Sequence, residues 1–117
     1  LTVLAACGSD SASVDLSGKT FTRETGKRAI TIDAVDNNFK PQFVTVSAGT
    51  KVTFKNVGRN LHNVYSVGDT FTSIATPDFG PDEQGSVTFD RAGDYPYYCT
   101  LHGTPTRGMT GAIRVVT

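Results

Sequence analysis

The sequence carries no excess charge of either sign and no run of basic residues. Its 117 residues contain eleven Lys and Arg side chains and eleven Asp and Glu side chains, so the formal net charge is zero. A length of this order corresponds to a single domain. A protein that binds a nucleic acid backbone needs a concentrated positive surface, so we do not expect nucleic acid among the partners.

Signals for helices are also missing, since no stretch combines helical periodicity with capping residues. Apolar and polar residues instead alternate with a period of two, which is the pattern of half-buried strands. The alternating stretches are 30–34, 44–47, 51–55, 86–90 and 112–115. Turn residues separate them, apart from an irregular connection over 70–85 that we expect to contain one helical turn. Seven or eight short strands predict an all-β protein, an antiparallel β-sandwich.

The first residues, LTVLAACGSDS, contain an apolar run that is too short to span a bilayer. We interpret residues 1–6 as the end of a secretory signal peptide, because Leu4 to Cys7 resembles a bacterial lipobox, in which the cysteine is acylated. Residues 7–20 would then be a flexible tether with the lipid on Cys7, and residues 21–117 the folded domain. This predicts a location outside the cytoplasm, with membrane contact through a lipid anchor only.

Cysteine, histidine and methionine are scarce: the chain has two Cys, two His and one Met. A disulfide between Cys7 and Cys99 is one interpretation, whereas acylation of Cys7 leaves Cys99 as the only thiol. Cys99, His102 and Met109 lie within eleven positions, and His62 lies 37 residues upstream of Cys99. Loops from both sheets of a sandwich gather at its ends, which would bring His62 to the other three.

A thiolate, two imidazoles and a thioether are donors that suit copper. The sulfur donors favour Cu(I), imidazole holds either oxidation state, and three strong ligands with one weak axial Met define a blue-copper site. Zinc is an alternative for one Cys and two His, but it would need a fourth strong ligand or a water. Taken singly, a buried Cys, a lone His and a Met are ordinary structural residues. Their conjunction on an all-β scaffold favours a metal site.

Four segments resemble the plastocyanin-type cupredoxins, a family of small blue-copper proteins. They are FKPQFVTVSAGTKVTFKN (39–56), HNV (62–64), GDYPYYCTLH (93–102) and GMTG (108–111), within a resemblance that spans roughly residues 28–117. The resemblance implies a Greek-key, cupredoxin-like β-sandwich and one copper ion in a type 1 site. It also implies that His62, Cys99 and His102 are the equatorial ligands and Met109 the axial ligand.

Two further roles are implied by the resemblance. Asn63 would fasten the first ligand loop to the segment after the cysteine, and such outer bonds orient ligands. Tyr98 would offer electrons a route to a remote surface, although a plain strand aromatic is equally compatible with its position. The sequence departs from plant plastocyanins in one place, because the spacer GTPTRG between His102 and Met109 is longer than theirs.

The resemblance implies single-electron transfer through copper that cycles between Cu(I) and Cu(II), and no enzyme activity. The chain has no spare His pairs for the additional coppers of multicopper enzymes. Redox partners would bind transiently to a small apolar surface near His102, and the protein would act as a monomer. Arg59 and Arg107 would favour an acidic partner there, or would simply be solvated. The alternative function is an extracytoplasmic copper carrier that delivers the metal to a copper oxidase.

Overall fold

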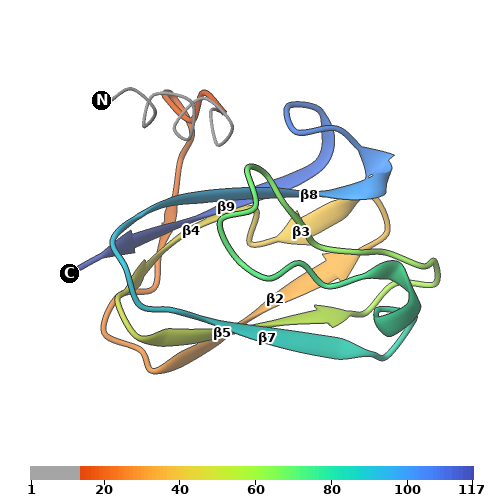
Figure 1. Ribbon diagram of the computed structural model, residues 1–117, viewed down its shortest axis with the longest axis horizontal. Coiled ribbons are helices and arrows are strands. Elements are labelled where there is room, and N and C mark those ends of the chain that lie inside the picture. Colours follow the sequence, from red (N-terminus) through yellow and green to blue (C-terminus); the bar gives the residue numbers. More distant parts are fainter. Residues whose placement is uncertain (1–13) are drawn as a thin grey trace.

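Two β-sheets face one another in the computed structural model, which describes residues 14–117 (Figure 1). The first sheet has the order β1-β4-β9-β8-β6, and the second has the order β3-β2-β5-β7. The strands are β1 (Thr22–Arg23), β2 (Ala29–Val35), β3 (Asn38–Lys40), β4 (Phe43–Ser47), β5 (Thr50–Asn56), β6 (Tyr65–Ser66), β7 (Gln84–Phe89), β8 (Gly93–Gly103) and β9 (Gly108–Val116). The predicted all-β sandwich is confirmed. The described residues form nine strands rather than seven or eight, because β1 and β6 are too short to show an alternating pattern.

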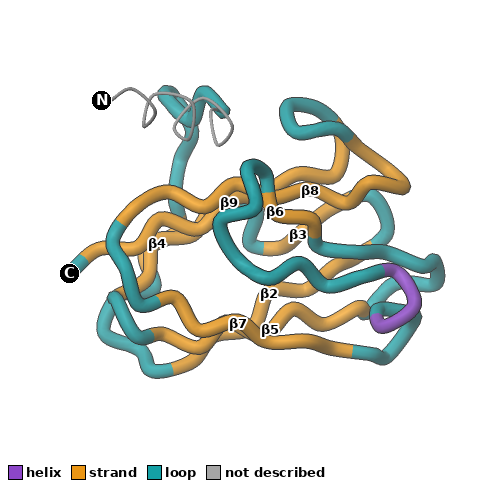
Figure 2. The backbone as a smooth tube through the Cα atoms, in the orientation of Figure 1, coloured by secondary structure: helices purple, strands orange, loops and turns teal. Residues whose placement is uncertain are grey.

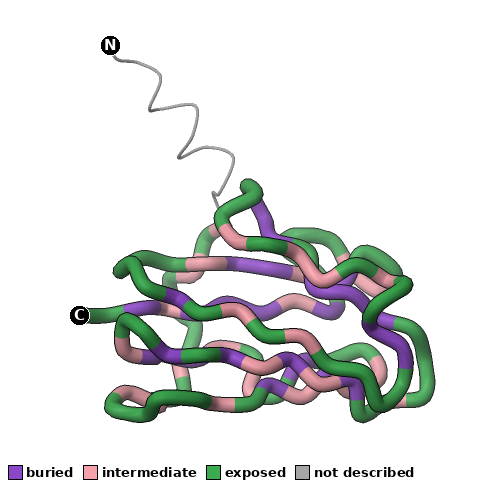
Figure 3. The backbone as a smooth tube through the Cα atoms, turned by 60° about the horizontal axis from the view of Figure 1, so that its bottom comes forward, coloured by how far each residue is buried: buried purple, intermediate pink, exposed green. Residues whose placement is uncertain are grey.

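The core lies between the sheets and is built from the apolar half of each alternating strand. Ile32 and Ala34 of β2, and Val52 and Phe54 of β5, are fully buried, while the residues between them lie nearer to solvent. Figure 3 shows this alternation as short buried segments along the strands, with exposed turns at their ends. Each buried aliphatic or aromatic side chain contributes roughly 1.5–3 kcal/mol, so the alternation itself holds the two sheets together.

The pairing within the sheets corrects the expectation of an antiparallel sandwich. β2 runs parallel to β5, and β4 runs parallel to both β1 and β9. The sheets are mixed because the chain crosses to the opposite sheet after every strand except β2 and β8. Alternation with a period of two is the same in either strand direction, so the sequence pattern could not reveal which strands are parallel.

The long connection between β6 and β7 contains one turn of 3-10 helix, η1 (Thr76–Asp78), and the predicted helical turn is confirmed. Figure 2 shows the connection running along the sandwich to this turn at one end. Pro77 lies in the first turn, where its missing N–H is not needed. No helix among residues 14–117 is long and apolar enough to cross a membrane.

The predicted signal-peptide remnant, the lipidation of Cys7 and the first part of the tether lie outside the described residues. The rest of the predicted tether, residues 14–20, contains a turn in which the Lys19 amide donates to the Leu16 carbonyl at 3.2 Å. Phe21 packs on the sandwich, with its ring centroid 5.5 Å from that of Phe43. The division between tether and domain stays a prediction.

Tyr97 is the largest of the fully buried side chains, and its buried hydroxyl group should destabilise the fold. Its ring packs edge-on against Phe39 and Phe54, with centroids 4.9 and 5.2 Å away. Its hydroxyl finds no hydrogen-bond partner among the described residues, and burial raises the pKa of this hydroxyl. An unpaired buried polar group costs about 1–3 kcal/mol, so we expect Tyr97→Phe to raise the free energy of unfolding by about 1 kcal/mol. Urea denaturation of the metal-free protein measures this, and a loss of stability would contradict an unpaired hydroxyl.

Candidate metal centre

A β-bulge at the end of the β8–β9 hairpin carries two of the predicted ligands. The pairing of β8 with β9 is regular up to Tyr98 and resumes at Gly103. The four residues of β8 in between, Cys99 to His102, face a single residue of β9, Met109. A bulge bends its strand and re-aims the side chains it carries. Cys99 still follows the alternation of the strand, with buried Tyr97 two residues before it, whereas beyond Cys99 the irregularity leaves Leu101 exposed and His102 half-buried.

The spacer GTPTRG, the segment that is longer than in plant plastocyanins, forms a tight hairpin of its own. Its two glycines pair with one another, so residues 104–107 make the tip, where the Thr104 amide donates to the Arg107 carbonyl at 2.8 Å. Gly108 has a φ of +78°, and a Cβ there would meet the His102 carbonyl oxygen at 2.6 Å, so this position requires glycine. The extra length leaves the sandwich as a protrusion (Figure 1), and Met109 keeps its register against the bulge.

His62 comes from the loop between β5 and β6, which the fully buried Asn56 holds in place. The Asn56 amide nitrogen donates to the carbonyls of Asn60 and Phe79 at 2.8 and 2.9 Å. Its amide oxygen accepts from the Gly58 nitrogen at 2.9 Å. The backbone amide of His62 also donates to the Phe79 carbonyl, at 3.3 Å. The path of the ligand loop is thus set by a buried amide whose oxygen and nitrogen are both bonded.

Three side chains converge at the end of the sandwich, where one ligand atom each of His62, Cys99 and His102 lie within 4.8 Å of one another. The two Nδ1 atoms are 3.2 Å apart, and Cys99 Sγ lies 3.8 Å from His62 Nδ1 and 3.6 Å from His102 Nδ1. His62 and Cys99 are fully buried, and His102 is half-buried. Two ring nitrogens and a sulfur that face one another so closely are an arrangement that a shared cation stabilises.

Asp36 contacts the outer nitrogen of the His62 ring from outside the cluster. Its Oδ1 lies 3.0 Å from His62 Nε2. The backbone amide of Arg59, followed by the His62 ring, holds the pKa of Asp36 below its usual range, so the carboxyl group is ionised at neutral pH. An ionised carboxylate only accepts hydrogen bonds, so the contact favours the tautomer in which Nε2 carries the hydrogen and Nδ1 presents its lone pair to the cluster. This is the tautomer that metal binding through Nδ1 requires.

Asn63 joins the His62 loop to the bulge. Its amide oxygen accepts from the Thr100 amide at 2.9 Å, and its amide nitrogen donates to the Thr100 hydroxyl at 2.7 Å. The same nitrogen donates to the Thr76 hydroxyl at 2.9 Å. Because Thr100 directly follows Cys99, these bonds join the segments of the first two predicted ligands, which is the placement that the resemblance implied.

The donors in this cluster fit copper. A thiol and two imidazoles face one another in a largely buried site, and no carboxylate joins them within the described part of the chain. Met109 is fully buried in the same apolar cluster as Cys99, and its register sets it against the bulge. Soft sulfur donors combined with imidazole select copper over harder metals. The axial role of Met109 stays a prediction.

Sequence reasoning placed His62, Cys99 and His102 in one site, and the structure brings them together. The sequence reasoning did not identify Asp36, which the sequence shows only as the first residue of the turn Asp36-Asn37-Asn38. The available signal was an acidic residue directly after a buried strand. That signal points to His62 only once β2 and β5 are known to be parallel neighbours.

Comparison with known proteins gives concordant results. The sequence model of the copper binding proteins of the plastocyanin/azurin family matches residues 26–116. A chloroplastic plastocyanin from Silene latifolia subsp. alba is 33% identical over 87 residues, which cover 66% of this chain and 52% of that protein, so the chain spans about half of this relative. An amicyanin variant with Cu(I) superimposes with a TM-score of 0.64 at 27% identity, over 76% of this chain and 83% of that one. A copper-containing nitrite reductase from Thermus scotoductus SA-01 superimposes with a TM-score of 0.63 at 29% identity, over 76% of this chain and 22% of that one.

The family match covers most of the chain and includes all four predicted ligands. The structure supplies the second, independent observation, because three of those four side chains direct ligand atoms at one another. The chain belongs to the plastocyanin/azurin family of copper-binding proteins, with His62, Cys99 and His102 positioned to form a type 1 copper site.

Proposed function

We propose that this protein carries single electrons between redox partners outside the cytoplasm. The observation that supports this most directly is the buried convergence of one thiol and two imidazole nitrogens, with His102 as the one side chain of the three that is only half-buried. Bound copper supplies a Cu(I)/Cu(II) couple in such a donor set. With Met109 as a fourth donor, no position would stay open for a substrate, which favours a carrier over an enzyme.

The residues around the donors hold them still. Asn56 and Asn63 fix the His62 loop, and the bulge between paired strands fixes Cys99 and His102. Donors that are held by packing and by a second layer of hydrogen bonds keep one arrangement when the charge of the site changes. A site that need not rearrange suits repeated gain and loss of one electron.

Exposed apolar side chains next to the ligands support a docking surface for a redox partner. Leu61 is 53% exposed and directly precedes His62, while Leu101 is 50% exposed and directly precedes His102. Val57, on the same loop as Leu61, is 45% exposed. Small apolar surfaces suit brief encounters between redox proteins, because a low contact area allows fast release. We propose that the partner contacts this surface beside His102.

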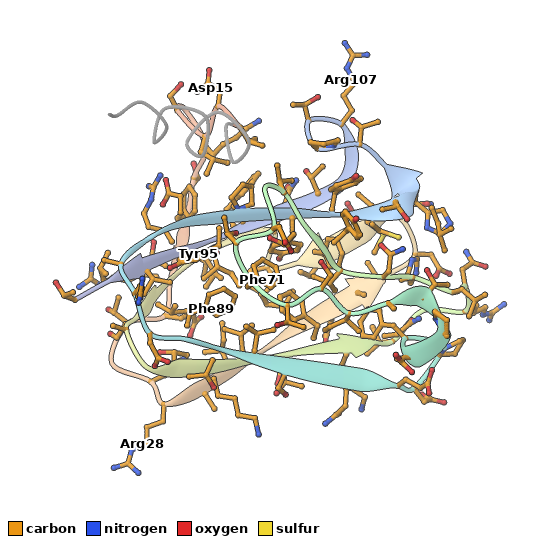
Figure 4. The ribbon with its side chains drawn as sticks, viewed as in Figure 1. Asp15, Arg28, Phe71, Phe89, Tyr95 and Arg107 are labelled. Atoms are coloured by element: carbon orange, nitrogen blue, oxygen red, sulfur yellow. The ribbon has the colours of Figure 1, made fainter. Side chains whose placement is uncertain are left out.

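Two arginines border this end of the molecule. Arg107 lies at the tip of the spacer hairpin and points away from the sandwich (Figure 4), and Arg59 is exposed in the His62 loop. Neither forms an ion pair within residues 14–117. Free positive charge at a rim accelerates association with an acidic partner. We propose an acidic partner surface on this basis.

Tyr98 gives the proposed electron route a surface end. It directly follows the buried Tyr97 and precedes Cys99, and its ring lies edge-on to Tyr65 with centroids 5.8 Å apart. Tyr65 belongs to the short strand β6 and is 51% exposed. A route through Tyr98 would therefore reach solvent at the Tyr65 ring. The inward-facing Tyr97 suits this role less, because its ring is fully buried against Phe39 and Phe54 and reaches no surface.

The remaining parts of the proposal rest on the sequence. The lipobox-like Leu4 to Cys7 supports a lipid-anchored protein on the outer face of a cell membrane or in the periplasm. We also propose that the protein acts as a monomer, since transient electron carriers work through small, free surfaces.

A copper titration of the purified metal-free protein tests the proposed function. We expect Cu(II) to produce an intense blue absorption band that ascorbate bleaches and an oxidant restores over many cycles. A colourless protein would contradict the proposal. A protein that binds copper but surrenders Cu(I) to a weak chelator within one cycle would instead favour the copper carrier, which the single, buried Met109 disfavours.

Replacing Met109 with leucine tests the predicted axial ligand. The substitution nearly conserves volume, so the fold should lose less than about 1.5 kcal/mol. We expect the blue band to persist, because the three strong donors remain. The reduction potential should rise by about 60 mV, a tenfold change in the reduction equilibrium, because hydrocarbon in place of a sulfur donor disfavours the more highly charged Cu(II). Voltammetry measures the shift, and either complete loss of copper or an unchanged potential would contradict an axial role.

A further inference from the structure

The strand pairing of the second sheet places an acidic residue directly behind the first histidine. β2 and β5 are parallel neighbours in which Ala34 lies opposite Asn56. The pairing extends one bond further, because the Val57 amide donates to the Ala34 carbonyl at 3.0 Å. Both strands therefore end at the same edge of the sheet. Asp36 leaves β2 at the point where the loop to His62 leaves β5.

The Asp36 carboxylate makes several bonds to this loop. Oδ1 accepts from the backbone amides of Arg59 and Asn60 at 3.1 and 3.2 Å, and Oδ2 accepts from Arg59 at 3.2 Å. Oδ1 also lies 3.0 Å from His62 Nε2. A Cβ at Gly58 would lie 2.2 Å from the same oxygen, so the close approach of the carboxylate requires glycine there. The contact is a built feature of the loop and involves three different donors.

The charge of this carboxylate has a direct path to the metal cluster. It faces one nitrogen of the His62 ring, and the other nitrogen faces Cys99 and His102. The ring is fully buried, whereas the Asp36 side chain is 33% exposed. A carboxylate on the outer nitrogen of a metal-binding histidine fixes the orientation of the ring and makes the ligand more basic. A more basic ligand and a nearby negative charge stabilise Cu(II) more than Cu(I).

We propose that Asp36 is a positioning residue of the copper centre, which orients His62 and shifts the balance between the two oxidation states toward Cu(II). The inference rests on copper binding at His62 and does not depend on electron transfer to any partner. Asp36 would thus act on the metal only through the histidine. A purely structural role, in which Asp36 only anchors the amides of Arg59 and Asn60, predicts altered stability without an altered redox balance.

The variant Asp36→Asn separates the two roles. Its amide oxygen can still accept from the backbone amides and from His62, but its negative charge is gone. We expect a folded blue protein in which the equilibrium for reduction of bound copper is shifted about tenfold toward Cu(I), which is about 59 mV for a one-electron couple. Chelator competition should show the matching change, an affinity for Cu(II) that falls about tenfold more than the affinity for Cu(I). Loss of an outer partner of a ligand commonly costs 10–100-fold in metal affinity, and the partial exposure of Asp36 places it at the lower end.

Asp33→Asn is the matched control, because it removes the same charge from β2, the strand that directly precedes Asp36, while Asp33 has no hydrogen-bonded contact to the ligand loop within the described residues. Its redox balance should stay within twofold of the original protein. An unchanged balance in Asp36→Asn, or an equal shift in both variants, would overturn the proposal.

A measurement on the metal-free protein keeps the proposal testable if Asp36→Asn does not fold. Nitrogen NMR of the unaltered chain, with the His62 ring neutral, should show the hydrogen on Nε2, because Oδ1 of Asp36 holds it there. A ring that carries its hydrogen on Nδ1 would overturn the proposal, since Asp36 would then not set the metal-binding tautomer.

Discussion

Replacing Cys99 with serine is expected to abolish the blue absorption band and to weaken copper binding by more than about 100-fold. Removal of a residue that only hydrogen-bonds a metal ligand costs up to about 100-fold in affinity, and removal of the ligand itself should cost more. Cysteine binds a metal as the thiolate, whereas a serine hydroxyl stays protonated and offers a hard, neutral oxygen. The fold itself should survive, because the new hydroxyl lies where Sγ now faces His62 Nδ1 at 3.8 Å and His102 Nδ1 at 3.6 Å. Visible spectroscopy and competition with a chelator of known affinity measure the two effects.

Cys7→Ser provides the control for this experiment, since it makes the same chemical change at the other cysteine. Cys7 belongs to the lipobox-like segment, so its replacement should leave the blue band and the copper affinity of the purified domain unchanged. A Cys99→Ser protein that stays intensely blue would show that the thiolate is not the source of the band. Loss of the blue band in Cys7→Ser would indicate that Cys7, and not Cys99, binds the metal.

Asn56→Ala is expected to cost the metal-free protein about 3–5 kcal/mol of unfolding free energy. The fully buried Asn56 side chain bonds the carbonyls of Asn60 and Phe79 and the amide of Gly58. Each buried group left without its partner costs about 1–3 kcal/mol. A small domain is stable by only about 5–15 kcal/mol, so this one substitution removes a large part of the total. Copper affinity should fall as well, because the same bonds set the path of the loop that carries His62.

Asn60→Ala is the matched control for this loss of stability. The Asn60 side chain is exposed and makes no hydrogen bond within residues 14–117, whereas its backbone groups would keep theirs. A surface change of this kind usually stays within about 0.5 kcal/mol. Urea denaturation compares the two variants, with the midpoint expected to fall in Asn56→Ala at an unchanged slope. Equal stability of both variants would show that the buried amide does not hold the loop.

The long spacer shows how the site tolerates a change of length. Its two glycines pair with one another, so the extra residues form a protruding tip and do not enter the space between His102 and Met109. The tip also carries Arg107 outward, to the end of the molecule where we propose that partners dock. The longer GTPTRG spacer, in which the sequence departs from plant plastocyanins, is thus compatible with the predicted set of copper donors.

The sequence alone was sufficient for the fold class, for the three donors His62, Cys99 and His102, and for the metal, while the axial role of Met109 stays a prediction. Strand alternation is a local property, because side chains at every second position face the same side of any strand. The donors were recognisable because histidine, cysteine and methionine are so scarce that His62, Cys99, His102 and Met109 left few alternatives. Their chemistry points to copper wherever the chain places them together.

Strand direction, the bulge and the contact of Asp36 with His62 were decided only by the tertiary structure. Period-two patterns are identical in parallel and antiparallel strands, so the crossings that make β2 and β5 parallel had no local signature. The bulge depends on how Cys99 to His102 register against Met109, and the contact of Asp36 with His62 depends on two strands that end at one edge. Such contacts arise from long-range pairing, which no short stretch of sequence encodes.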